Sequence, residues 1–391
     1  MKPLILPLLL TLFLNSNANG QWEPTSLARS TECLATIGEH IIAGADHAYY
    51  STDEGTTWQI SSIQEPGFFC VNDSQVFATT YQVLAGGRVL PSGIFLSTDS
   101  GATWIERDSG LPRTYYTAML AFGDTVFAGV GGQVWRSIDD GITWDSIGSG
   151  ITPLAGVFDG IVSIGGSLFA NHHGIFRSDD FGLHWYSVRD NGADIIAAHD
   201  SLLYAGDSTV WVSSDKGNTW LVRGAGLPSN SVVQAFAFWD SITFIAVDSL
   251  APTCRVYLSS NRGTSWREVS SGLPATFNSA LTVDSEYVFA ATKGPGVWRR
   301  SLADILGLAS VKSETSLREP LSSISQIGSR LALHSSGNCE VQILNLLGAE
   351  VLAKRGAGTL DLDLSGLPAG VYFAVVRANG TQEVKKIAVV Q

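Results

Sequence analysis

The sequence predicts an all-β fold in which a seven-bladed β-propeller is followed by a small C-terminal β-sandwich. The first sign is an octet, Ser-x-Asp/Asn-x-Gly-x-Thr/Ser/His-Trp, which occurs six times with its third residue at positions 53, 99, 139, 180, 215 and 261. This spacing is about the length of one four-stranded propeller blade. The second sign is composition, because 41 Gly and 11 Trp among 391 residues fit short strands joined by tight turns.

Each octet is expected to form a tight turn between two strands. Its third residue can accept hydrogen bonds from backbone N–H groups a residue or two ahead, and its Gly supplies the positive φ that the turn needs. The closing Trp is large and apolar, so we expect it in the seam between neighbouring blades. The third-position residues are expected to be structural, and they are Asp53, Asp99, Asp139, Asp180, Asp215 and Asn261.

Strand patterns indicate seven blades although there are six octets. An aromatic-rich strand precedes each octet, and a seventh copy around Trp298 leads into no octet. The ring must close, because an open last blade would expose strand edges. The segment that begins at Trp22 resembles the strand after each octet, so residues 21–28 are predicted to supply the outer strand of the last blade. Residues 276–301 are predicted to supply its inner strands, which gives a propeller over residues 21–301.

The start of the chain has the form of a secretory signal. Lys2 is followed by an apolar run over residues 4–14, which is too short to span a bilayer as a permanent helix. Small residues near Ala18 and Gly20 fit a cleavage site, so residues 1–20 are predicted to be a signal peptide. The mature protein is expected to be soluble or surface-attached and not transmembrane.

Charge and cysteine content limit the expected partners. The formal net charge is −12, and the basic residues are scattered singly along the chain. Nucleic acid is not expected as a partner, because a phosphate-binding surface needs clustered Lys and Arg. The four cysteines follow no metal-ligand spacing. Cys33 and Cys70 fall on predicted inner strands of neighbouring blades, where both a disulfide and free buried thiols are compatible with the sequence.

The repeat pattern ends after Ser301. A Ser-rich stretch low in aromatics follows, and it predicts a linker over residues 302–325. Short strand patterns then return, which predicts a β-sandwich over residues 326–391. The predicted strands are residues 330–333, 340–344, 350–353, 359–364, 370–377 and 383–390.

The octets resemble the Asp box, or BNR repeat, of sialidases, two-propeller xyloglucanases, sortilin-type receptors and single-propeller photosystem II assembly factors. In those proteins the box lies on the rim as an element of the fold, away from the functional face. The resemblance therefore implies that the repeated acids form turns and do not catalyse a reaction.

Residues 326–391 resemble the type A sorting domain of the type IX secretion system of Bacteroidetes-like bacteria. Such domains direct their passenger across the outer membrane and are often cleaved off. The resemblance implies export through the periplasm to the medium or the outer cell surface, with the secretion translocon and a surface attachment apparatus as partners. The segments that carry it are residues 345–348 (NLLG), 367–372 (LPAGVY) and 385–391 (KKIAVVQ).

Functional residues are expected in the loops opposite the octet turns, because seven-bladed rings bind ligands at the mouth of the channel. The candidate binding residues in these loops are Tyr81, Arg88, Arg113, Tyr115, Tyr116, Asn171, His172 and His173. Hydrolysis of a glycoside requires paired carboxylates. The loop carboxylates that could supply such a pair are Asp46, Asp207 and Asp248.

Signatures of specific enzymes are missing. The resemblance to sialidases implies three convergent arginines, but no Arg-Ile-Pro or Arg-Leu-Pro occurs near the first blade. Arg136, Arg177 and Arg299 share one repeat position just before the octet, so by symmetry they should lie along the blades and not converge. Two-propeller xyloglucanases use a cleft between two rings, and this chain has room for one. His172 and His173 mark no third ligand, so neither a metal nor another cofactor is expected.

These observations favour a secreted or surface-displayed propeller that binds a glycan or a protein without catalysis. The alternative is a secreted glycoside hydrolase, sialidase-like or xyloglucanase-like, that acts on a polysaccharide.

Overall fold

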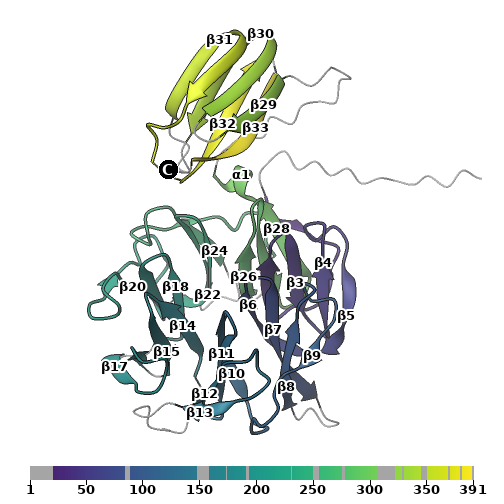
Figure 1. Ribbon diagram of the computed structural model, residues 1–391, viewed down its shortest axis with the longest axis vertical. Coiled ribbons are helices and arrows are strands. Elements are labelled where there is room, and N and C mark those ends of the chain that lie inside the picture. The colour runs from purple at the N-terminus through teal and green to yellow at the C-terminus, as the bar shows by residue number, and fades with distance from the viewer. Residues whose placement is uncertain are drawn as a thin grey trace, which may run out of the picture.

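The computed structural model describes residues 21–83, 89–147, 158–172, 174–190, 193–229, 231–249, 255–274, 278–306, 322–327, 330–344, 350–368, 370–378 and 381–389. Within these residues the protein is almost entirely β-sheet, with one short helix, α1 (Leu302–Ile305). Seven four-stranded antiparallel sheets form a ring, and a separate five-stranded sheet lies at one end of it (Figure 1). The predicted all-β fold class, a seven-bladed propeller followed by a small C-terminal β domain, is confirmed, and that domain is one curled five-stranded sheet where the sequence predicts a β-sandwich.

The blades are meanders in which consecutive strands pair. The strands of blade 1 are β2 (Cys33–Ile37), β3 (His40–Gly44), β4 (His47–Ser51) and β5 (Gln59–Gln64). Those of blade 2 are β6 (Pro66–Asn72), β7 (Gln75–Val83), β8 (Val89–Ser97) and β9 (Ile105–Glu106). Those of blade 3 are β10 (Tyr116–Phe122), β11 (Thr125–Val130), β12 (Gln133–Ser137) and β13 (Asp145–Ile147).

The same order repeats around the rest of the ring. The strands of blade 4 are β14 (Gly160–Ile164), β15 (Ser167–Asn171), β16 (Ile175–Ser178) and β17 (Tyr186–Arg189). Those of blade 5 are β18 (Ile195–His199), β19 (Leu202–Gly206), β20 (Val210–Ser213) and β21 (Leu221–Val222). Those of blade 6 are β22 (Ser231–Trp239), β23 (Ile242–Ser249), β24 (Arg255–Ser259) and β25 (Arg267–Glu268). Blade 7 consists of β26 (Asn278–Val283), β27 (Tyr287–Thr292), β28 (Gly296–Ser301) and β1 (Glu23–Pro24).

The octets form the turns between the third and fourth strands, and their hydrogen bonds differ from the expected ones. Asp53 does not accept from N–H groups one or two residues ahead. Its Oδ1 accepts from the backbone N–H of Thr57, four residues ahead, at 2.8 Å. The N–H of Gly55 instead donates to the Ser51 hydroxyl at 2.8 Å. The reason is that Glu54 and Gly55 both have positive φ, 57° and 80°, and two such residues in succession reverse the chain within the octet.

The sixth octet shows that an amide can replace the carboxylate. In the first octet the Thr57 hydroxyl donates to Asp53 Oδ2 at 2.7 Å. In the sixth, Asn261 Nδ2 lies 2.9 Å from the Ser265 hydroxyl, and Asn261 Oδ1 still accepts the Ser265 N–H at 2.9 Å. A hydroxyl can accept as well as donate, so the turn is preserved.

The octet Trp side chains lie in the seams between blades, as expected. Trp144 of blade 3 packs against apolar residues of blade 2, and Trp266 of blade 6 packs against those of blade 5. The indole of Trp144 donates to the carbonyl of Arg107, just after β9, at 2.8 Å. The indole of Trp266 donates to the carbonyl of Arg223, just after β21, at 2.7 Å. Each of these Trp residues thus ties its blade to the end of the preceding outer strand.

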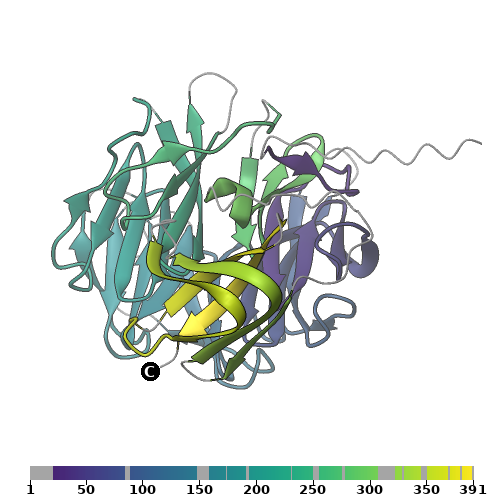
Figure 2. The same cartoon turned by 90° about the horizontal axis from the view of Figure 1, so that it is seen from above.

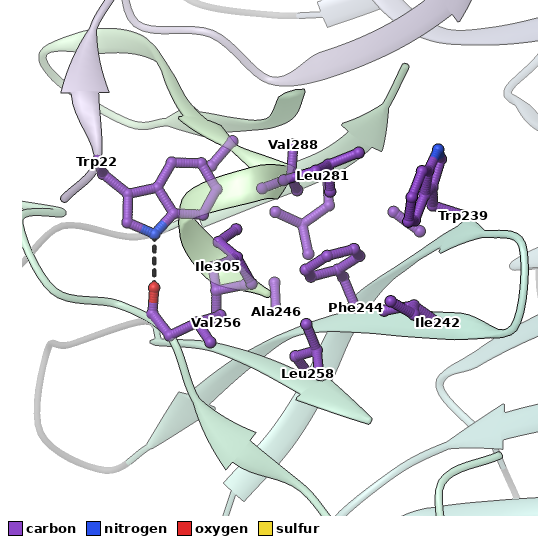
Figure 3. Close-up of a cluster of buried hydrophobic side chains, with 14 of the residues drawn as sticks. Trp22, Trp239, Ile242, Phe244, Ala246, Val256, Leu258, Leu281, Val288 and Ile305 are labelled. Carbon is purple, nitrogen blue, oxygen red and sulfur yellow. Dashed lines mark hydrogen bonds between the residues drawn. The ribbon is translucent and has the colours of Figure 1, made fainter. Parts of the chain in front are cut away.

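Trp22 makes the same contact for blade 7, although it comes from the other end of the chain. Its indole donates to the carbonyl of Val269, just after β25, at 2.7 Å, and its side chain is 2% exposed within a cluster from blades 6 and 7 (Figure 3). The following strand, β1, pairs antiparallel with β28, and the two lie side by side in Figure 2. This is the pairing that the Trp22 segment predicts from sequence.

An ion pair holds the closing strand. Arg299 Nε donates to Glu23 Oε1 at 2.9 Å, across the β1–β28 pairing, and its Nη1 donates to the carbonyl of Glu54 in blade 1 at 2.6 Å. The guanidinium also lies 4.9 Å from the centre of the Tyr287 ring. One side chain therefore links blade 7, the closing strand and blade 1.

The C-terminal sheet contains β29 (Ser322–Ile327), β30 (Arg330–Leu344), β31 (Glu350–Asp363), β32 (Gly370–Ala378) and β33 (Thr381–Val389). β30 pairs with β29, β31 and β32, so one curled sheet encloses the small apolar core. The four strands predicted between residues 330 and 364 are two long ones, and β30 carries an irregularity between His334 and Asn338.

Two elements fall within the predicted linker over residues 302–325. Helix α1 occupies its start and packs its apolar residues, Leu302 and Ile305, into the cluster around Trp22. β29 begins at Ser322 and pairs antiparallel with β30, although its Ser content is typical of a linker. The region between these elements lies outside the described residues, as do residues 1–20.

Three cysteines are described, and all are free thiols. Cys33 is buried and its Sγ lies 3.6 Å from the carbonyl of Pro66. Burial raises the pKa of Cys33, and it raises the pKa of Cys70 to about 12. The structure therefore has free thiols and no disulfide at Cys33 and Cys70. Cys254 lies outside the described residues.

Replacing Trp22 by Ala is expected to lower the free energy of unfolding by about 3 to 5 kcal/mol, the usual cost of removing a large buried aromatic side chain. Thermal unfolding followed by circular dichroism measures the effect. The matched control is Gln21→Ala, because Gln21 is the exposed neighbour of Trp22. An unchanged unfolding midpoint for Trp22→Ala would contradict closure through this residue.

Candidate binding site on the loop face

A cavity of about 370 Å³ opens on the face opposite the octet turns. Its walls come from the connection between β1 and β2, the turn between β3 and β4, the connection between β5 and β6, and the end of β7. These are the fourth-to-first and second-to-third connections, where the sequence predicts functional residues. The lining residues are Arg29, Ser30, Glu32, Ala45, Asp46, Glu65, Pro66 and Tyr81.

Backbone hydrogen bonds hold these connections together. The N–H of Glu65 donates to the carbonyl of Asp46 at 3.1 Å, and the N–H of Tyr81 donates to the carbonyl of Glu65 at 2.9 Å. Glu65 has a φ of 46°, which is uncommon for a residue with a side chain and reverses the chain between blades 1 and 2. The pocket therefore has a fixed backbone frame.

Asp46 is the centre of the polar contacts in the pocket. Its Oδ1 accepts from the hydroxyl of Tyr49 at 3.0 Å, and its Oδ2 lies 3.3 Å from Arg29 Nη1 and 3.6 Å from His47 Nδ1. Partial burial raises the pKa of the Asp46 carboxyl, but the Tyr49 hydrogen bond and the Arg29 charge outweigh this and lower the pKa overall. Asp46 is therefore a carboxylate and a poor proton donor.

Tyr81 forms an apolar wall of the pocket. A Cβ at Gly67 would clash with its ring, so the ring lies directly on the Gly67 backbone. Its hydroxyl donates to the carbonyl of Tyr116 at 3.5 Å. Burial raises the pKa of Tyr81, and the nearby negative charge of Glu32 raises it further. Tyr81 therefore stays neutral.

The other candidates in blades 2 and 3 have different environments. Tyr116 is 1% exposed and its ring belongs to the core between these blades, so it is not available at the surface. Tyr115 is 53% exposed and its carbonyl accepts from Gly131. Arg113 lies near Asp108, and its charge only partly offsets the burial that raises the pKa of that carboxyl. Arg88 lies outside the described residues.

The candidates in blade 4 do not line the pocket. Asn171 is fully buried, and its amide donates to the carbonyl of Ala193 at 2.9 Å. His172 lies edge-on against Phe158 with ring centres 5.9 Å apart. His173 lies outside the described residues. In the part of the chain that the structure describes, no three His, Cys, Asp or Glu side chains gather as a metal site requires.

Asp207 and Asp248 are not in the pocket with Asp46. Asp207 accepts from the N–H of Thr209 at 2.8 Å and from the indole of Trp211, and it lies 3.8 Å from Arg189. Asp248 lies on β23 opposite Val232. The structure thus places Asp207 in a local network of blade 5 and Asp248 on a strand of blade 6.

The three repeat-related arginines lie along the blades, as their symmetry predicts. Each donates to the carbonyl of the fourth octet residue in the next blade. The pairs are Arg136 to Phe181 at 3.4 Å, Arg177 to Lys216 at 3.2 Å and Arg299 to Glu54 at 2.6 Å. These arginines brace neighbouring octet turns, and they do not converge on a common ligand.

A second group of titratable residues lies on the loop face, and sequence analysis did not find it. Burial raises the pKa of Asp108, and the adjacent negative charge of Glu106 raises it further. Burial, followed by the charge of Asp108, raises the pKa of Tyr116 to about 12. Glu106 lies on β9, a two-residue strand without an alternating pattern, so no sequence signal marked it.

A family model described as the secretion system C-terminal sorting domain matches residues 321–390. The C-terminal unit is therefore the sorting domain that the resemblance at residues 345–348, 367–372 and 385–391 implies. Among the described residues, no helix has the length and apolar character needed to cross a membrane.

Similarity to known proteins supports the propeller. Over 241 residues the chain is 26% identical to a probable oligoxyloglucan-reducing end-specific xyloglucanase of Neosartorya fischeri, and the match covers 50% of this chain and 29% of that protein. The chain thus spans less than a third of this relative. A GH74 enzyme of Niastella koreensis has a TM-score of 0.58 at 13% identity, over 95% of this chain and 75% of its own. YCF48 bound to D1 peptide has a TM-score of 0.55 at 13% identity, over 74% of this chain and 96% of its own.

Replacing Tyr49 by Phe is expected to raise the pKa of Asp46 toward its ordinary value of 3.8, because the hydroxyl that stabilises the carboxylate is removed. Carboxyl NMR signals followed through a pH titration measure the shift. Tyr50→Phe is the matched control, since its hydroxyl donates to Gln59.

The same pair of variants tests the pH dependence of stability. The pKa of Asp46 in the folded protein is below its ordinary value of 3.8. The stability that ionised Asp46 contributes is therefore complete above pH 3.8 and is lost as the pH falls through the pKa of the folded protein. Tyr49→Phe should lose less stability than the wild type over that interval. Equal pKa values of Asp46 in the wild type and in Tyr49→Phe would contradict the hydrogen bond between Tyr49 and Asp46.

Proposed function

We propose that this chain is a secreted or cell-surface propeller that binds an extracellular glycan or protein without chemically changing it, and that the type IX secretion system exports it. The observation that carries the proposal is the pocket around Asp46 and Tyr81 on the loop face. Its volume falls within the range of ordinary ligand sites. The sorting domain supports the export route.

The contacts of the candidate catalytic groups favour binding over catalysis. Asp46 has a lowered pKa, which disfavours it as a general acid. Arg136, Arg177 and Arg299 are occupied as braces between blades, so they are not a carboxylate-binding triad of the sialidase kind. The hydrogen bonds of the octet turns support their assignment as Asp-box repeats, which serve the fold.

The two kinds of relative point to different functions. The YCF48 structure is of a complex with D1 peptide, and 96% of that protein is similar in fold to 74% of this chain. The xyloglucanase and the GH74 enzyme favour a glycoside hydrolase as the second candidate. Asp108 is the candidate general acid for that function, because burial and the charge of Glu106 raise the pKa of its carboxyl.

A panel of polysaccharides and sialosides separates the two candidates. The mature protein is expected to release no reducing sugar from any panel member, including any member that it binds. Binding measured by calorimetry and sugar release measured by reducing-end assay are the two readouts. Release that disappears in Asp108→Asn, but persists in the control Asp248→Asn, would overturn the binding proposal in favour of the hydrolase.

Ending the chain at Leu306 removes the sorting domain and keeps the ring with helix α1. The truncated protein is expected to accumulate in the periplasm of its host, because the address for the outer membrane step is gone. Immunoblots of periplasm, cell surface and medium measure its location, with the full chain as control. Truncated protein outside the cell at the level of the full chain would contradict export through this domain.

A further inference from the structure

The charges in the pocket around Asp46 do not balance. Three carboxylates line it, from Glu32, Asp46 and Glu65, but only one guanidinium, from Arg29. Arg29 already pairs with Asp46 at 3.3 Å. Within the described residues neither Glu32 nor Glu65 has an ion-pair partner, so two carboxylates stay uncompensated. Because the two uncompensated carboxylates line the same pocket, the pocket attracts cations and repels anions.

The remaining walls of the pocket are apolar. They consist of Ala45, Pro66 and the ring of Tyr81, which lies on the backbone of Gly67. Lysine and arginine side chains carry a charged head on a stem of methylene groups, and they bury that stem along apolar surface. An aromatic ring also attracts a cation placed over its face. The pocket thus offers one surface for the stem and another for the head.

We propose that this pocket receives one basic side chain, lysine or arginine, from a partner protein. Glu32 and Glu65 bind the charged head, while Tyr81 and Pro66 contact the stem. Asp46 stays paired with Arg29, which keeps Arg29 from attracting acidic ligands. This assignment rests on the proposed binding function and names the chemistry of its ligand. An amino sugar shares the cationic group but has no methylene stem.

The test uses small probes of matched shape on the mature full chain. N-acetyl-arginine amide is the positive probe, and N-acetyl-citrulline amide has nearly the same shape without the charge. Calorimetry or ligand-observed NMR is expected to show that the arginine amide binds at least about tenfold more tightly, because only it forms charge-assisted hydrogen bonds to the carboxylates. Glucosamine is the third probe, and weaker binding than that of the arginine amide is expected.

The combined variant Glu32→Gln and Glu65→Gln is expected to weaken binding of the arginine amide about tenfold and to leave the citrulline amide unchanged. The control is Glu39→Gln, since Glu39 lies exposed in the turn between β2 and β3, on the opposite face of the same blade. It should bind as the wild type does. The unfolding midpoint of each variant is measured to show that the fold is retained. The comparison of the arginine amide with the citrulline amide uses the wild type, so it tests the inference even if a variant fails to fold.

Three results would overturn this inference: equal binding of the arginine and citrulline amides, arginine binding unaffected by the combined variant, or glucosamine as the tightest of the probes. The proposed function fails on a different result, namely sugar release that depends on Asp108. Equal binding of the arginine and citrulline amides, together with a panel ligand that binds and is not hydrolysed, would overturn the basic-side-chain assignment alone and leave the binding function in place.

Discussion

The hydrogen bond from the Trp22 indole to the carbonyl of Val269 is the constraint on which the rest of the ring depends. It places a segment from the start of the chain in the position that an octet Trp occupies in other blades, as Trp144 and Trp266 show. β1 can then pair with β28, and Arg299 fixes the pairing through Glu23. A ring built from repeats thereby becomes a closed structure in which a fourth strand covers β28 in the last blade.

Closure also builds the candidate site. The chain leaves β1 and crosses the loop face before it enters β2, and this crossing supplies Arg29, Ser30 and Glu32 to the pocket. The remaining walls come from blades 1 and 2, held by backbone hydrogen bonds from Glu65 to Asp46 and from Tyr81 to Glu65. The pocket therefore lies next to the closing segment, and its charge depends on residues that are in place only when the ring is closed.

The sequence was sufficient for the architecture because the architecture repeats. The regular octets and aromatic strands predicted the number of blades. The likeness of the Trp22 segment to the strand after each octet predicted how the ring closes. The details of the octet were not accessible, since the positive φ of a residue such as Glu54 has no sequence signal. Asp46 and Tyr81 were found because they occupy repeat-defined loops. Glu32 and Glu65 were missed because the other residues that line their pocket are distant in sequence, and Glu106 was missed because its two-residue strand carries no alternating pattern.

Backbone hydrogen exchange on wild type and Trp22→Ala tests the link between closure and site most directly. If closure through Trp22 fixes both blade 7 and the pocket, the variant should lose protection in β26, β27 and β28 and across residues 28–37, while blades 3 to 5 keep theirs. Unchanged protection in blade 7, or a loss spread evenly around the ring, would contradict this account.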